Sequence, residues 1–69
     1  MWYKTNSGVV YYIQENETES IVWLVWDDGL ALQTRLDAEV VCNTCDRIDM
    51  PKYGLIALRE MDKNIIHAY

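Results

Sequence analysis

The sequence predicts a mainly β fold, a small antiparallel barrel or bent sheet with a C-terminal hairpin and at most one short helix. Three observations carry this prediction. Residues 9–13 and 21–26 are built almost entirely from β-branched and aromatic residues, which favour strands. An Asp-Gly pair soon after the second run is typical of a hairpin turn. The chain has 69 residues, so we expect a single domain over residues 1–69.

The first half of the chain predicts an antiparallel meander. The first strand, residues 9–13, is followed at residues 15–19 by a polar segment that is too long for a tight hairpin turn. The second strand, residues 21–26, ends at Asp27-Asp28-Gly29. Residues 30–35 then alternate between two sides, which indicates a half-buried third strand. Three consecutive strands with short connections are typical of a meander.

Residues 36–52 leave two alternatives open. Asp37 is suited to cap a short helix, because its carboxylate accepts hydrogen bonds from the N–H groups of a first helical turn. Residues 40–42 are equally suited to a short closing strand. Residues 42–52 read as a loop that contains the two cysteines of the chain.

The last part of the chain is also open to two interpretations. Residues 54–60 and 65–69, separated by polar turn residues, predict a C-terminal hairpin. The alternative is an α+β arrangement with a helix near residues 54–63, because this stretch is rich in helix formers. The apolar residues at helical spacing are Leu55, Leu58, Met61 and Ile65.

Both strong strands are apolar on both faces. A sheet with one face in water would alternate apolar and polar residues along each strand. Both faces therefore need a cover, either from the C-terminal segment or from another chain. Because a chain this small covers them incompletely, the sequence predicts a homodimer or a bound partner.

The order of motifs from residue 8 to residue 42 is similar to that of a class of small barrels. Gly8 opens a strand, an acidic loop follows, and residues 21–29 form a strand that ends in Trp-Asp-Asp-Gly. This order resembles SH3-like barrels of the Tudor and KOW kind, with residues 36–41 closing the barrel. The resemblance implies a non-catalytic adaptor that binds peptides, methylated side chains or nucleic acid. The aromatic residues available to cage a methylated amine are Tyr11, Tyr12, Trp23 and Trp26, although their places inside strands favour core packing.

The charge is strongly acidic and unevenly distributed. Eleven acids and six bases give a formal net charge of −5. Residues 15–39 hold seven acids and one base, a net charge of −6. Phosphate binding requires clustered bases, so the sequence argues against direct contact with nucleic acid or an anionic membrane. It favours a protein partner with a basic surface, the alternative being a solvated acidic face.

The longest apolar run, residues 21–26, is too short to cross a membrane. Residues 1–8 lack the basic leader and apolar run of a signal peptide. We therefore expect a cytoplasmic protein whose cysteines are reduced.

Cys42-Asn43-Thr44-Cys45 is the one sequence motif whose side chains and spacing are typical of metal binding or redox chemistry. Two thiols at this spacing bind zinc or form a redox pair, although plain structural cysteines are the favoured interpretation. A zinc site needs further ligands, from His67 with Asp46 or Asp49, or from a second cysteine pair across a dimer axis. A redox pair belongs in a βαβ frame, which this sequence lacks. We therefore expect no cofactor, with zinc as the alternative.

No catalytic constellation is present. His67 is the only histidine and has no recognisable nucleophile partner, and Asp27-Asp28 stands at an exposed hairpin tip. With only three glycines, the chain also lacks a phosphate-binding loop. We therefore expect a protein that is not an enzyme.

These observations predict a non-catalytic protein-binding module. Its concrete form is a small acidic inhibitor, of the kind that viruses and mobile elements encode, which occupies a basic nucleic-acid-binding surface by phosphate mimicry. The alternative is a zinc- or thiol-stabilised structural subunit of a larger assembly, with Cys42 and Cys45 as ligands. The exposed parts of Trp23, Trp26 or Tyr12 are the expected anchors, because aromatic anchors ringed by charge are typical of binding hot spots. The predicted contact residues are Glu15, Glu17, Glu19, Trp23, Trp26, Asp27 and Asp28.

Overall fold

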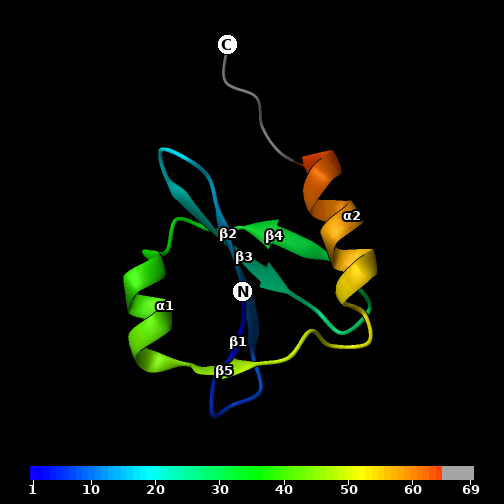
Figure 1. The fold of residues 1–69 in the computed structure, drawn as a ribbon. Helices are drawn as coiled ribbons and strands as arrows, with labels where there is room; N and C mark the ends of the chain where they lie inside the picture. The colour runs from blue at the N-terminus through cyan, green and yellow to red at the C-terminus, as the bar shows by residue number, and fades with distance from the viewer. Residues whose placement is uncertain (65–69) are drawn as a thin grey trace.

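In the computed structural model, which describes residues 1–64, a five-stranded antiparallel sheet lies between two short helices (Figure 1). The strands are β1 (Trp2–Lys4), β2 (Val10–Glu15), β3 (Ser20–Val25), β4 (Ala31–Gln33) and β5 (Asp46–Ile48). The helices are α1 (Ala38–Thr44) and α2 (Gly54–Asn64). The strand order is β4-β3-β2-β1-β5. The prediction of a mainly β fold is therefore confirmed.

The central hairpin of the sheet is β2–β3, which is paired from Val10 opposite Val25 to Glu15 opposite Ser20. The next turn leads into β4, and there the Leu30 N–H donates to the Asp28 carboxylate at 3.0 Å. The three strands of the predicted meander are present, although the third is shortened to β4.

One face of the sheet packs beneath α2. Trp23 is fully buried at 0% exposure in a cluster with the buried Trp2 and the α2 residues Ala57 and Met61. The indole N–H of Trp23 donates to the side-chain oxygen of Gln14 at 3.0 Å, so its polar atom is satisfied inside the fold. This face holds the larger of the two core clusters.

The opposite face packs against α1 through a smaller cluster. Val41 of α1 is buried against Ile13 and Val22. Asp37 caps the helix, because its carboxylate accepts a hydrogen bond from the Glu39 N–H at 3.0 Å. The capped helix is thus confirmed, and the alternative of a closing strand at residues 40–42 is wrong.

The predicted C-terminal hairpin is wrong over residues 54–64, which form α2, so the alternative of a helix there is confirmed. Ala57 and Met61, four residues apart, are buried against the sheet, whereas Leu55 and Ile56 remain exposed. One helical face therefore supplies the cover that the sheet requires. Residues 1–64 also hold two helices, where the sequence predicts at most one. The second predicted hairpin segment, residues 65–69, lies outside the described residues.

The predicted loop over residues 42–52 is also wrong in part. Helix α1 continues to Thr44, and β5 then pairs with β1, which places Tyr3 opposite Arg47. Strand β5 has three residues, of which only Ile48 is half-buried, so it leaves no periodic signal in the sequence. Its pairing covers the outer edge of β1.

Replacing Gly29 by alanine tests how closely α2 approaches the β3–β4 turn. Gly29 has a φ of +92°, and a Cβ atom there would overlap Cγ2 of Ile56 and lie 2.8 Å from its Cβ. We expect G29A to lower the free energy of unfolding by about 2–4 kcal/mol, because a left-handed backbone penalty adds to a clash.

Gly8 is the matched control for this substitution. It has a φ of +93°, and nothing lies within 4 Å of an added Cβ. G8A carries only the backbone penalty, so we expect a loss of about 1–2 kcal/mol. Chemical denaturation measures both values, and equal losses would contradict the close approach of Ile56.

Candidate functional site

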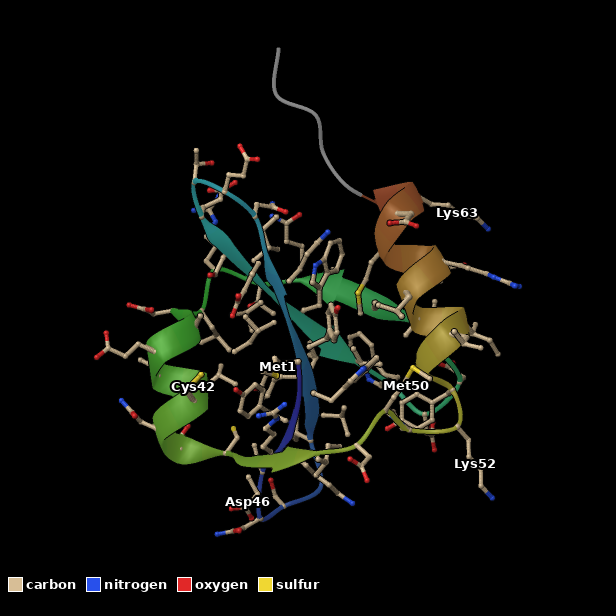
Figure 2. The ribbon with its side chains drawn as sticks, in the orientation of Figure 1. Met1, Cys42, Asp46, Met50, Lys52 and Lys63 are labelled. Carbon is tan, nitrogen blue, oxygen red and sulfur yellow. The ribbon has the colours of Figure 1, made fainter. Side chains whose placement is uncertain are left out.

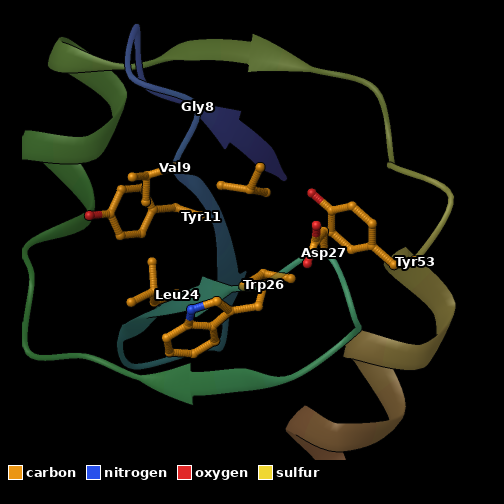
Figure 3. A pocket seen from close by; sticks show the side chains of 9 residues that line it. Gly8, Val9, Tyr11, Leu24, Trp26, Asp27 and Tyr53 are labelled. Carbon is orange, nitrogen blue, oxygen red and sulfur yellow. The ribbon is translucent and has the colours of Figure 1, made fainter.

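An open hollow of about 530 Å³ lies where β2 begins and β3 ends (Figure 3). It is lined by residues 8–11, which lead into β2, by residues 24–27, where β3 ends, and by Tyr53. Hollows of this size bind side chains or small molecules. It is therefore the candidate functional site.

The hollow arises from strand alternation and from the limited reach of α1. Val10 and Val25 are buried beneath α2, so their chain neighbours on each side point to the other face. These neighbours are Val9, Tyr11, Leu24 and Trp26. Helix α1 covers the far part of that face, where Val41 meets Ile13 and Val22. The part of that face where β2 begins and β3 ends stays uncovered by α1.

The lining is apolar with a single charge. Trp26 is 44% exposed and Val9 is 37% exposed, while Tyr11 is half-buried. In the view of Figure 3, Tyr53 and Asp27 stand on the side of the hollow away from Tyr11. Among the described residues that line it, Asp27 is the only charged one. A ligand would therefore meet an aromatic wall and one carboxylate.

Of the predicted aromatic anchors, Trp26 lies at the hollow, and the prediction for Trp23 as a contact residue is wrong. Trp23 is fully buried beneath α2, so no partner reaches it. The two residues are three positions apart, and strand alternation therefore directs them to opposite faces. That parity was a usable signal for separating them.

The aromatic residues available for a cage are divided in the same way. Tyr11 and Trp26 line the hollow. Tyr12 instead packs against Trp2, with ring centroids 4.7 Å apart, on the α2 face together with Trp23. Sequence reasoning missed Tyr53, which enters the hollow from the segment before α2 and has no neighbour in sequence among the lining residues.

The predicted acidic contact residues fall into two separate groups. Glu15, Glu17 and Glu19 lie in or beside the β2–β3 turn, whereas Asp27 and Asp28 lie after the opposite end of β3. Strand β3 has six residues, so about 20 Å separates the two groups. They do not form one continuous strip.

Further acids join the first of these groups. The Thr34 N–H donates to the Val22 carbonyl at 2.9 Å, so the chain leaves β4 near the start of β3. Asp37 and Glu39 follow there, at the N-terminus of α1.

Within residues 1–64 the one ion pair formed is Lys63–Glu60, at 3.8 Å. None of the seven acids of residues 15–39 therefore forms an ion pair with a described base, although the charge of Glu15 interacts with the N-terminal ammonium of Met1.

The two cysteines are free thiols on and beside α1. Cys42 is exposed, and its Sγ lies 3.4 Å from the Tyr3 hydroxyl, a hydrogen-bonded pair that raises the pKa of Tyr3. Cys45 is half-buried and caps α1, its N–H donating to the Val41 carbonyl at 3.0 Å. Asp46 lies apart from Cys42, at the start of β5 (Figure 2).

Among the described residues, no three histidine, cysteine, aspartate or glutamate side chains gather where they could hold a metal ion. Asp46 and Asp49 thus do not complete a set with the two thiols. The third ligand considered, His67, lies outside the described residues.

Neither helix of residues 1–64 has the length and apolar character needed to cross a membrane.

Comparison with protein-family models, with curated proteins and with solved structures gave no match. The likeness of residues 8–42 to Tudor and KOW barrels therefore stays a prediction.

The double variant C42S/C45S tests whether a metal holds the fold. We expect the free energy of unfolding to change by less than about 1 kcal/mol, because Cys42 is exposed and Cys45 is half-buried. Thermal unfolding of both proteins with and without added zinc is the measurement. A zinc-dependent rise in Tm that the variant lacks would contradict this expectation and favour the structural subunit.

Proposed function

We propose that this chain is a non-catalytic protein-binding module that contacts its partner through the hollow. The observation that carries the proposal is Trp26, a 44% exposed indole in an open apolar lining. Tryptophan buries more area on contact than most residues and is enriched among binding hot spots. A half-exposed indole beside unburied aliphatic side chains is therefore suited to a partner.

The surroundings of Trp26 support a contact role over a folding role. Both core clusters are complete without it, since neither includes Trp26. Val9, its neighbour in the lining, is likewise exposed and belongs to neither cluster. Exposed apolar side chains grouped in a hollow are typical of interaction sites.

The seven acids of residues 15–39, which form no ion pair with a described base, support a partner with a basic surface. Opposite potentials speed encounter and favour the correct orientation. The five acids near the β2–β3 turn support the more specific proposal of an inhibitor that mimics phosphates. This role and a cytoplasmic location belong to the same proposal. A homodimer and a zinc-dependent subunit are the competing proposals.

W26A tests the proposed function. We expect it to weaken partner binding at least tenfold, because truncation of a central aromatic anchor typically costs about 2 kcal/mol or more. The stability of the fold should change by less than about 1 kcal/mol, since Trp26 is half-exposed. The measurement is affinity for a protein captured by photo-crosslinking in the source cells and then purified.

L55A is the matched control, because Leu55 is 60% exposed on α2 and lies outside the hollow. It should leave the affinity unchanged. Equal affinities for W26A and the unmodified chain would contradict the proposal. A large loss of stability in W26A would instead make Trp26 a core residue.

The triple variant E15Q/E17Q/E19Q tests phosphate mimicry. We expect weaker binding to the same partner and a shallower dependence of affinity on salt, because fewer charges meet the basic surface. D46N/D49N/D62N removes three exposed acids elsewhere and is the matched control. Equal losses in the two triple variants would assign the effect to net charge and contradict mimicry by the turn.

A further inference from the structure

We infer that the hollow is a binding site for an arginine side chain that a basic partner protein presents. This inference rests on the proposed function and names the chemistry that the hollow recognises. Three features of the lining carry it: the exposed indole of Trp26, the carboxylate of Asp27, which forms no ion pair with a described base, and the apolar walls formed by Val9 and Leu24.

The carboxylate of Asp27 determines the sign of the charge that a ligand of the hollow carries. Asp27 is exposed, and the one ion pair among the described residues joins Lys63 to Glu60, so no described base neutralises Asp27. An anion in the hollow would be repelled by Asp27. A purely apolar side chain would remove water from the carboxylate and provide no hydrogen bond in return. A cation satisfies the carboxylate while it fills the hollow.

The indole favours arginine among cations. A guanidinium is planar and weakly hydrated, so it stacks on an aromatic face and keeps its edge N–H groups free for a carboxylate. Trp26 and Asp27 both follow β3 and line the hollow, and Figure 3 shows the indole extending toward Leu24 and the carboxylate lying beside Tyr53. The hollow therefore presents an aromatic face on one side and a carboxylate on another. Lysine has a compact, strongly hydrated ammonium that gains less from stacking.

The size and wall chemistry of the hollow suit a long side chain. About 530 Å³ exceeds the volume of one side chain, which leaves room for part of the backbone that presents it. The aliphatic stem of arginine packs on apolar surface while its head group stays polar. Val9, just before β2, and Leu24, near the end of β3, provide that apolar surface (Figure 3).

The test uses three small probes on the intact chain: N-acetylarginine methylamide, its neutral isostere N-acetylcitrulline methylamide, and N-acetylleucine methylamide. Binding is followed by the NMR signal of the Trp26 indole N–H, assigned by its loss in W26L. We expect the arginine probe to bind about fivefold more tightly than the citrulline probe at low salt. The preference should shrink in about 1 M salt, where the Debye length is about 3 Å.

D27N and D28N form a matched pair, since each removes one negative charge and the two residues are adjacent. Asp28 lies outside the lining, and its carboxylate accepts the Leu30 N–H in the turn. D27N should abolish the preference for arginine over citrulline, whereas D28N should preserve it. Equal effects of the two variants would overturn the inference, because general charge would then explain the binding.

The remaining outcomes separate this inference from the proposed function. Leucine binding as tightly as arginine would overturn the arginine site and leave an apolar docking surface. No shift of the Trp26 signal with any probe would count against both. A shift that depends on protein concentration without a probe would place a second copy of the chain in the hollow and overturn the arginine site.

Discussion

The structure depends on one constraint, which is that the β2–β3 hairpin is apolar on both faces and each face must be covered. Helix α2 covers one face with Ala57 and Met61. Helix α1 has seven residues and is about 10 Å long, whereas the six-residue strand β3 spans about 20 Å. The shorter helix therefore leaves part of its face uncovered, and the hollow is a direct result of that difference in length.

The connection after β4 decides which end stays uncovered. The Thr34 N–H bonds to the Val22 carbonyl, so the chain leaves the sheet beside the start of β3 and α1 packs there. The opposite end, where Trp26 follows β3, receives no helix on that face. The turn that closes this end needs Asp28 to accept the Leu30 N–H, and its neighbour Asp27 is then left at the rim of the hollow.

The sequence was informative where a local signal existed. The β-branched runs predicted β2 and β3, and Asp37 correctly indicated a helix cap. The sequence left residues 54–64 open between strand and helix, because a short apolar run fits both the two-residue period of a strand and the 3.6-residue period of a helix. Packing against the sheet decides in favour of the helix. Strand β5 and Tyr53 gave no local signal, since both reach their neighbours through contacts distant in sequence. Trp26 was predicted as a contact residue because it is aromatic, and Asp27 because it belongs to the acidic stretch of residues 15–39, so residue type alone indicated both.

The negative charge of Asp27 disfavours self-association of the chain through the hollow. In a two-fold dimer the same patch from each copy meets itself, so a contact through the hollow would bring the Asp27 residues of both copies together. The acidic Asp28 stands beside each of them, and the whole chain carries a net charge of −5. The argument for a homodimer came from two uncovered strand faces, but α2 covers one of these faces and α1 covers part of the other. The part of the second face that stays uncovered has the carboxylate of Asp27 at its rim, a combination that favours a basic partner over a second copy.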